Sequence, residues 1–342
     1  MDLASAYRGR RVFLTGHTGF KGAWLAWWLQ RLGATVMGYA LPPSTDPNLW
    51  QALALDRDLP GVLADVRDLD RLSRELRNFR PDVVFHLAAQ ALVLPSYRDP
   101  VDTFATNLMG TVNVLEAARH CDSARSVVIV TTDKCYRNEG TGIPFREDDP
   151  LGGADPYSAS KACAEIAVEA YRHSFWTAGR GLATVRAGNV IGGGDWSPHR
   201  LVPDLVRANQ AGQPLALRCP EARRPWQHVL DPLRGYLMLG AELTTDPGTF
   251  SGAWNFGPAE TEARQVRELV ELAGGAWQPD PNPTPPEATL LSLDSTRSRE
   301  RLGWRPRWSL ETAAVRTMAW YRAFLQGDSA DLLCAADLEA HR

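Results

Sequence analysis

The sequence predicts an α/β fold in which a doubly wound parallel sheet is followed by a smaller C-terminal lobe. Short apolar runs rich in β-branched residues, such as 11–15 and 127–130, alternate with helical segments through the first half of the chain. Strands buried on both faces read as near-continuous apolar runs, and strand–helix alternation is typical of a parallel sheet covered by helices. A glycine-rich segment at 16–22 follows the first run, where such sheets turn into their first helix.

The expected elements follow one another in a regular order. We expect strands at 11–15, 35–40, 82–87, 127–130 and 182–186, and helices at 23–32, 68–78 and 103–119. After residue 188 the loops become rich in Gly, Pro and Trp, and the expected helices, 203–211 and 262–273, are shorter. This change predicts a sheet domain over 1–188, mainly a smaller lobe over 189–326 and a peripheral tail over 327–342.

Composition argues against several classes of protein. Its 342 residues, 44% of them hydrophobic, suffice for one large core or two lobes. A net charge of −3 with scattered basic residues argues against a nucleic-acid partner. Five cysteines without a Cys-x-x-Cys pair indicate neither a disulfide framework nor a metal site. Because no signal-peptide pattern or membrane-length apolar segment is found, we expect a cytoplasmic protein without a membrane partner.

The glycine-rich segment is a candidate dinucleotide-binding loop. It reads Gly16-His17-Thr18-Gly19-Phe20-Lys21-Gly22. Glycines let the backbone turn tightly and approach a pyrophosphate at a helix N-terminus, although a purely structural turn is the alternative. The acidic residue usual about 20 residues later is missing, since Tyr39, Ala40 and Leu41 occupy that region. His17 and Lys21 add possible positive charge, so the choice between NAD and NADP stays open.

Candidate catalytic residues lie at two places in the chain. Thr132, Asp133 and Lys134 follow the apolar run 127–130, at the carboxyl end of an expected strand, where open α/β sheets bind ligands. Tyr157 and Lys161 are four residues apart at the start of a helical stretch and share one face. A cationic lysine lowers the pKa of a neighbouring phenol, which can then take a proton from a hydroxyl group. A helix-surface Tyr/Lys pair is the alternative, and the glycine loop makes it the weaker one.

Further residues complete a pattern that resembles a known family. The features are Gly-x-x-Gly-x-x-Gly, Asp65-Val66, His86-Leu87-Ala88-Ala89, Asn107 and Tyr157-x-x-x-Lys161. Over roughly the whole chain they resemble the extended short-chain dehydrogenase/reductase family. The resemblance implies a Rossmann fold over 1–188 that binds NAD. It also implies a cofactor site made of Gly16, His17, Gly19, Phe20, Lys21, Gly22, Asp65, Val66, Leu87, Ala88, Ala89, Asn107, Tyr157 and Lys161.

Within this family the chain is similar to nucleotide-sugar 4,6-dehydratases, most of all to those acting on CDP-glucose. The segments that carry the similarity are 15–22, 131–136, 186–196 and 224–228. The similarity implies oxidation of the sugar at C4, loss of water across C5–C6 and reduction at C6. Tyr157, Thr132 and Lys161 would serve the oxidation, and Asp133 would protonate the leaving oxygen. It also implies a nucleotide-sugar site over 189–326 made of Asn189, Arg200, Arg224, His228 and Arg299, for which surface or interlobe ion pairing is the alternative.

Several alternatives remain open at the level of sequence. The dehydratases that act on dTDP-glucose have Glu where this chain has Lys134, which would either take the C5 proton or stabilise an enolate. A nucleotide-sugar 4-epimerase and a non-enzymatic NAD-binding sensor are the other functions considered. The family resemblance further implies a homodimer or homotetramer. Trp24, Trp27 and Trp28 are expected in the core, whereas the loop residues Trp196 and Trp226 could stack on a ligand.

Overall fold

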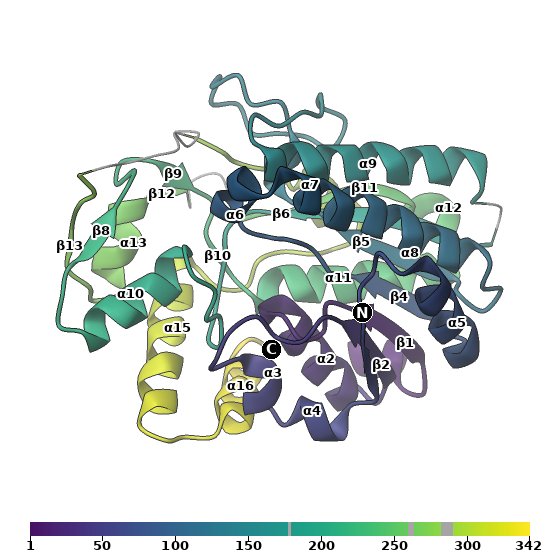
Figure 1. The fold of residues 1–342 in the computed structure, drawn as a ribbon, viewed down its shortest axis with the longest axis horizontal. Helices are drawn as coiled ribbons and strands as arrows, with labels where there is room; N and C mark the ends of the chain where they lie inside the picture. The colour runs from purple at the N-terminus through teal and green to yellow at the C-terminus, as the bar shows by residue number, and fades with distance from the viewer. Residues whose placement is uncertain (177–178, 259–262, 282–289) are drawn as a thin grey trace.

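The centre of the molecule is a seven-stranded sheet in which every pair of neighbours is parallel (Figure 1). The computed structural model describes residues 1–176, 179–258, 263–281 and 290–342. In sheet order the strands are β11 (Gly252–Phe256), β6 (Gly181–Ala187), β5 (Ser126–Val130), β4 (Val83–His86), β1 (Arg11–Thr15), β2 (Thr35–Ala40) and β3 (Gly61–Leu63). The predicted doubly wound parallel sheet is confirmed.

Helices cover both faces of the sheet. One face carries α5 (Leu69–Phe79), α8 (Gly110–Arg119) and α9 (Pro156–Ser174), and the other carries α1 (Leu3–Tyr7), α2 (Phe20–Arg31) and α11 (Leu230–Thr245). Side chains alternate along each strand, so Phe13 enters one core cluster while Val12 and Leu14 enter the other. Trp24 and Trp27 lie in the larger cluster, as expected. Helix α2 is buried on nearly all sides because the C-terminal elements also pack on it.

One expected helix is interrupted. The segment predicted as a single helix over 103–119 consists of α7 (Pro100–Phe104), a π-helical turn η1 (Ala105–Met109) and α8. Asn107 lies in the π turn, fully buried, and its side chain bonds the backbone of Gln90 and the hydroxyl of Ser160. The wider turn lets this amide enter the interior, a feature that apolar periodicity does not report.

The division between the sheet domain and the lobe differs from the one expected. Residues 230–256 return to the sheet, because α11 covers one face and β11 pairs with β6, with Trp254 opposite Val185. The smaller lobe contains α10 (Leu201–Gln210), β8 (Leu215–Leu217), β9 (Arg223–Arg224), β12 (Arg264–Gln265), α13 (Val266–Leu272) and β13 (Trp277–Pro279). The helix expected over 262–273 begins at Val266, and residue 262 lies outside the described residues.

The remaining elements are short connections and two longer C-terminal helices. They are α3 (Leu49–Ala52), α4 (Leu55–Asp58), α6 (Val93–Arg98), the 3₁₀ turn η2 (Asp133–Cys135), β7 (Val190–Ile191), β10 (Gln227–His228), α12 (Pro247–Phe250), α14 (Thr296–Arg301), α15 (Leu310–Leu325) and α16 (Ala330–Ala340). Strands β7 and β10 pair in parallel beyond the sheet's carboxyl edge. They lead the chain into and out of the smaller lobe.

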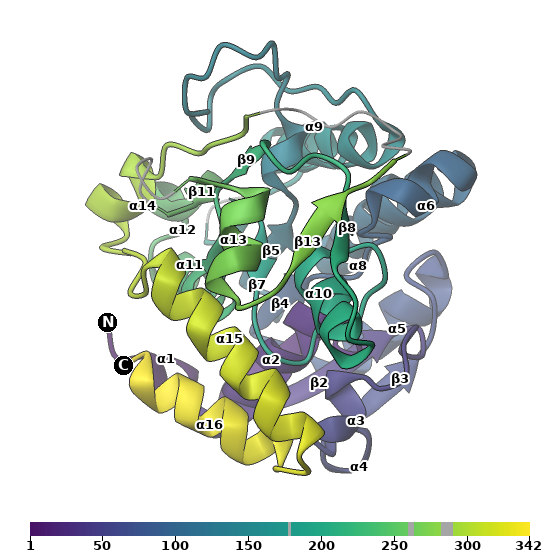
Figure 2. The same ribbon diagram turned by 90° about the vertical axis from the view of Figure 1, so that its left-hand side faces the viewer.

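The tail over 327–342, expected to be peripheral, is part of the core. Helix α16 lies beside α15 and close to α3 (Figure 2). Trp27 donates its indole N–H to Asp331 at 2.7 Å, and His341 lies 2.8 Å from the buried Asp231 carboxylate. Cys334 is fully buried in the main cluster. The short run of small and apolar residues in α16 gave too weak a periodic signal to predict this packing.

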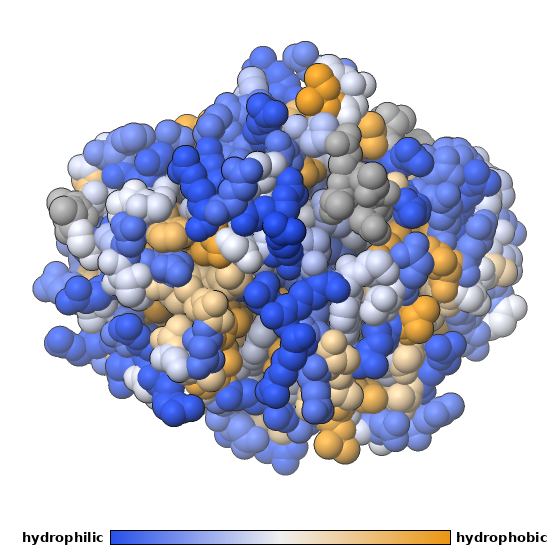
Figure 3. Space-filling model, turned by 180° about the vertical axis from the view of Figure 1, so that it is seen from behind, coloured by the Kyte–Doolittle hydropathy of each residue, from blue (hydrophilic) through white to orange (hydrophobic). Residues whose placement is uncertain are grey.

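Membrane spans and metal sites can be sought among the described residues. No helix within 1–176, 179–258, 263–281 and 290–342 has the length and hydrophobicity to cross a bilayer. Seen from behind, the molecule is covered mainly by hydrophilic side chains, with apolar residues in smaller patches (Figure 3). The same described residues contain no group of three or more His, Cys, Asp or Glu that could hold a metal ion.

Candidate active site

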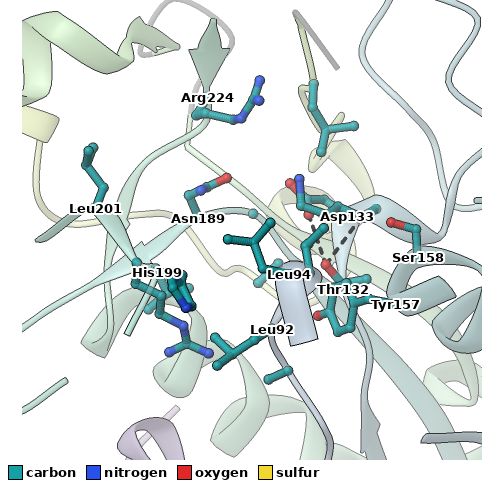
Figure 4. Close-up of a pocket in the computed structure, with 18 of the residues that line it drawn as sticks. Leu92, Leu94, Thr132, Asp133, Tyr157, Ser158, Asn189, His199, Leu201 and Arg224 are labelled. Carbon is teal, nitrogen blue, oxygen red and sulfur yellow. Dashed lines mark hydrogen bonds between the residues drawn. The ribbon is translucent and has the colours of Figure 1, made fainter. Parts of the chain in front are cut away.

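A cavity of about 660 Å³ opens at the carboxyl edge of the sheet, between the sheet and the smaller lobe. Its lining includes all five residues predicted to be catalytic, namely Thr132, Asp133, Lys134, Tyr157 and Lys161. In Figure 4, Thr132, Asp133 and Tyr157 occupy one side, and Asn189 and Arg224 lie across from them. The carboxyl end of β5 and the first turn of α9 therefore bring together groups that lie up to 29 residues apart.

The turn after β5 presents a carboxyl group to this cavity. Thr132 begins the 3₁₀ turn, and its hydroxyl donates to Asp133 Oδ1 at 3.0 Å while accepting from the backbone N–H of Lys134 at 3.3 Å. Asp133 is 2% exposed, and its Oδ2 has no hydrogen-bond partner among the described residues. Burial raises the pKa of Asp133, against the opposing effect of the Lys134 charge. A carboxyl in this state is suited to donating a proton.

Tyr157 stands in the first turn of α9. Asp155 caps the helix by accepting from Ser158 N at 2.9 Å, and Tyr157 N donates to the hydroxyl of Ser96 at 3.2 Å. Burial raises the pKa of the phenol to about 12, and the hydroxyl of Thr132 acts in the opposite direction. The phenol is thus held in the cavity wall by a well-capped helix.

The amine of Lys161 bonds the carboxyl end of β5. Its Nζ donates to the carbonyl of Val130 at 3.1 Å, and burial lowers its pKa to about 8. The charged groups that lower the pKa of Tyr157 include Arg200, whereas Lys161 is not among the main causes. The amine of Lys161 is therefore directed at the strand end, and the expectation that it lowers the pKa of the phenol stays a prediction.

The glycine loop has the geometry of a dinucleotide cradle. Gly16 has φ +75°, and a Cβ there would lie 2.6 Å from Ala88 N, so only glycine fits. A Cβ on Gly22 would lie 1.9 Å from Gly16 O. At Gly19 a Cβ would meet a single atom, 3.5 Å away, so the loop is open on that side. No side chain caps the N-terminus of α2 at Gly19, which leaves its first N–H groups for a pyrophosphate.

The two basic residues of this loop carry less positive charge than the sequence suggested. His17 is 1% exposed beside Gly38 and Trp50, and burial lowers its pKa to about 4, so the ring is neutral. Lys21 lines the catalytic cavity, where burial and then the charges of Arg200 and Lys161 lower its pKa to about 7. The sequence could not show that both side chains turn inward.

Other residues predicted to bind the cofactor lie along the sheet edge. Leu87 and Ala89 line the cavity, and Ala88 packs against Gly16. Asp65 follows β3, with its carboxylate bound to Arg67 at 2.6 Å, and Val66 is buried against Gly110. Phe20 also lines the cavity.

Asn107 does not reach the cavity lining. Its side-chain groups bond Gln90 and Ser160, so it ties the segment after β4 to α9. It supports the site from behind rather than presenting its amide to a ligand.

The predicted substrate residues separate into two groups. Asn189, Arg200 and Arg224 line the cavity, and Arg200 is held by Asp195 at 2.9 Å. His228 is fully buried away from the lining, between the rings of Trp24 and Trp308. Its Nδ1 accepts from Leu230 N at 3.4 Å, and its Nε2 lies 3.9 Å from the carboxylate of Asp337.

Arg299 also lies away from the cavity lining. Its guanidinium donates to Thr296 at 2.8 Å and lies 3.8 Å from Asp294. These partners lie within five residues of Arg299, so the structure shows a local ion pair at this position.

The two loop tryptophans separate as well. Trp226 lines the cavity, and its indole N–H has no partner among the described residues. Trp196 packs edge-on against Tyr321. Arg218 and His199 line the cavity but lay in loop segments without a motif, so sequence reasoning had no signal for them.

Comparison with known proteins identifies the family. The profile of the GDP-mannose 4,6 dehydratase family matches residues 13–318. The chain belongs to this family. It is an extended short-chain dehydrogenase/reductase of the nucleotide-sugar dehydratase group, as the sequence motifs indicated.

Individual relatives cover almost the whole chain. The CDP-glucose 4,6-dehydratase of Salmonella typhimurium is 44% identical over 341 residues, which cover 96% of this chain and 95% of that protein. The UDP-glucose 4-epimerase of Mycolicibacterium smegmatis is 31% identical, covering 91% of this chain and 98% of that protein. Among solved structures, the dTDP-glucose 4,6-dehydratase of Streptomyces venezuelae with NAD bound has a TM-score of 0.76 at 27% identity, covering 91% of this chain and 97% of that one.

Proposed function

We propose that this protein is an NAD-dependent CDP-glucose 4,6-dehydratase, a lyase that converts CDP-glucose into CDP-4-keto-6-deoxyglucose and water. The observation that carries the proposal is the buried Asp133 carboxyl, which shares a cavity with Tyr157. Oxidation at C4 needs a base for the hydroxyl, whereas loss of water also needs an acid at O6. The 44% identity to a CDP-glucose 4,6-dehydratase supports the same reaction and the same nucleotide.

The cavity residues divide the proton transfers among them. Tyr157 takes the proton of the 4-hydroxyl group in its phenolate form, which the hydroxyl of Thr132 and the charge of Arg200 favour. The ketone at C4 then makes the proton at C5 more acidic. We assign the removal of this proton to Lys134. As a neutral amine Lys134 accepts this proton, and as an ammonium it stabilises the enolate formed by its loss. Asp133 gives its proton to O6, which leaves as water.

The chain's own geometry fits a dinucleotide. Gly16, Gly19 and Gly22 would bring the backbone and the N-terminus of α2 against the pyrophosphate. Bound NAD would supply the acceptor for hydride from C4 and the donor of hydride to C6. Because His17 is neutral and Arg67 is held by Asp65 and Asp102, we propose NAD rather than the 2′-phosphorylated form.

We propose that Arg200, Arg224 and Asn189 hold the nucleotide sugar from the opposite wall. Arginine forks match the oxygens of a diphosphate. Asp195 orients Arg200, and Arg224 is only 2% exposed. His228 and Arg299 are left out of this site because both are engaged elsewhere.

Isotope transfer tests the proposed reaction. Deuterium placed at C4 of CDP-glucose should appear at C6 of the same product molecule, while C5 takes up hydrogen from solvent. A 4-epimerase, the second candidate on account of the 31% identical relative, would return the deuterium to C4 and leave C6 unlabelled. Mass spectrometry before and after removal of C6 distinguishes the two. Label retained at C4 of a galactose product would replace the dehydratase with the epimerase.

We further propose a cytoplasmic homodimer or homotetramer. The five cysteines are all unpaired, as is usual in a reducing compartment. Val101, Met109 and Ile166 are exposed apolar residues on the neighbouring elements α7, η1 and α9. Such residues suit a subunit interface. Light scattering of the purified protein measures the assembly, and a monomer at micromolar concentration would contradict the proposal.

A further inference from the structure

A buried ion pair lies directly behind the wall of the cavity. Glu165 on α9 and Arg186 on β6 are each 3% exposed. Arg186 donates from Nε to Oε1 of Glu165 at 2.9 Å and from Nη2 to Oε2 at 2.7 Å. Neither residue lines the cavity, and neither takes part in the proton transfers described above. Because burying two charges is costly unless every contact is satisfied, the other partners of this pair are informative.

The carboxylate of Glu165 also holds the end of β5. The hydroxyl of Thr131 donates to Glu165 Oε1, and one residue earlier the carbonyl of Val130 accepts from Lys161. Tyr157, Lys161 and Glu165 are spaced by four residues along one face of α9. Val130, the last residue of β5, and Thr131 directly after it are therefore both bonded by the face of α9 that carries Tyr157.

Arg186 holds the far end of the same turn. Its Nη1 donates to the hydroxyl of Tyr136 at 2.7 Å and to the carbonyl of Glu147 at 2.9 Å. The hydroxyl of Tyr136 in turn donates to Asn255 at 2.8 Å. Thr131 and Tyr136 stand immediately before and after the segment 132–135, so a single ion pair fixes both of its ends.

We propose that Glu165 and Arg186 are positioning residues that set the spacing between Tyr157 and the Asp133–Lys134 turn, and so keep water loss in step with oxidation at C4. The proposal rests on the proposed function. Helix α9 has its own anchors at Asp155 and Ser96. The ion pair holds the turn at both ends, in addition to backbone bonds such as Gly152 N to Cys135 O at 2.8 Å. Loosening the pair should therefore displace the groups for water loss more than the phenol.

Two isosteric variants test this positioning role. Thr131 and Thr184 both donate a hydroxyl to Glu165, the latter at 2.7 Å, but only Thr131 directly precedes the turn. Thr131→Val should slow water loss by ~10–100-fold and change oxidation less than ~3-fold, since a displacement of about 1 Å can cost ~10²-fold. Thr184→Val, the matched control, should change neither rate. Single-turnover absorbance of the reduced nicotinamide gives the first step, and product analysis gives the second.

Glu165→Gln is the stronger variant, with Arg186→Lys as its counterpart. In the protein that folds, both variants should slow water loss more than they slow oxidation at C4. Equal slowing of the two steps, or an unchanged ratio in Thr131→Val, would overturn the proposal.

A second measurement needs no substrate. Hydrogen exchange of the ligand-free protein should be faster over 132–136 in Thr131→Val and unchanged there in Thr184→Val. If the wild-type protein failed to dehydrate CDP-glucose, this measurement would still decide whether the pair fixes the turn. Unaltered exchange over 132–136 in Thr131→Val would remove the positioning role whatever the reaction.

Discussion

The hydroxyl of Thr132 donates to one carboxylate oxygen of Asp133 at 3.0 Å, and the other oxygen of Asp133 is unpartnered within the described part of the chain. Unsatisfied buried polar atoms are uncommon, and they concentrate where a ligand completes the hydrogen bonds. Burial raises the pKa of this carboxyl, so the proton needed at O6 can be held until the ketone has formed. The hydroxyl of Thr132 therefore helps to align both the phenol of Tyr157 and the carboxyl of Asp133.

Replacing Asp133 by Asn should separate oxidation from water loss. The amide keeps the shape of the carboxyl but has no acidic proton to give, so we expect water loss to slow by ~10²–10⁴-fold. The enzyme should still reduce its bound cofactor when substrate is added, as single-turnover absorbance would show. Lys134→Ala should separate the same two steps, and Lys134→Arg is the matched control that keeps the charge. Release of product at the normal rate by both Asp133→Asn and Lys134→Ala would make these residues structural.

Replacing Tyr157 by Phe should abolish the first step. The ring still fills its buried place, so we expect the melting temperature and NAD affinity to change little, while reduction of the bound cofactor slows by ~10²–10⁴-fold. The control is Tyr171→Phe on the same helix, whose hydroxyl bonds Glu116 far from the cavity lining. Near-normal turnover in Tyr157→Phe would exclude the phenol as the base.

Gly19→Ala should weaken NAD binding without unfolding the protein. A Cβ there meets only Gly16 O at 3.5 Å, so the fold accommodates it, but it would stand over the N-terminus of α2. We expect a loss of affinity of at least ~10-fold in calorimetric titration, about 1.4 kcal/mol. Gly248→Ala, whose Cβ would have its nearest contact at 3.7 Å on α12, serves as the control. Unchanged NAD affinity in Gly19→Ala would contradict the placement of the pyrophosphate.

Asp337 should make stability depend on pH in a defined window. Burial raises its pKa from 3.8 to about 6, against the opposing charge of Arg316, and the neighbouring His228 is kept neutral by its own lowered pKa. The stability due to the protonated carboxyl is fully present below about pH 4 and is lost as the pH rises through about pH 6. Asp337→Asn should therefore gain stability relative to the wild type across this window, by at most about 3 kcal/mol. Urea unfolding at several pH values measures the difference, and a pH-independent difference would refute it.

The nucleotide preference should favour cytidine. Sites built to bond one base leave polar groups unpaired with another, so we expect kcat/KM for CDP-glucose to exceed that for dTDP- or UDP-glucose by at least ~10²-fold. The expectation rests on the 44% identical relative. Equal values for the three substrates would show that the cavity does not read the base.

The catalytic pairing was readable in the sequence because it depends on local spacing. Tyr157 and Lys161 lie four apart on a helix, and Thr132–Lys134 follow a fully apolar strand, so both positions follow from periodicity and sheet topology. The strands were predictable for the same reason. Contacts between distant segments were not, since nothing near Lys161 in the sequence shows that its amine bonds Val130.

The errors at the other positions share a physical cause. His17, His228 and Arg299 are polar residues in motif-like segments, and polarity alone does not distinguish a ligand contact from an internal hydrogen bond or a packed ring. The return of β11 to the sheet was missed because Gly252 and Ala253 make a weak strand signal. Its pairing with β6 is settled by tertiary contact rather than by local preference.

The placement of α16 has a consequence for how the chain is made. The cavity walls and all seven strands of the sheet are complete in sequence well before α16, yet His341 contacts Asp231 and Asp331 contacts Trp27 of α2. During synthesis, the part of α2 that contacts α16 stays uncovered until residues 330–341 have been made. A chain that stops before residue 330 would lack the Asp331 partner of the Trp27 indole and would leave this aromatic surface open to chaperones and proteases.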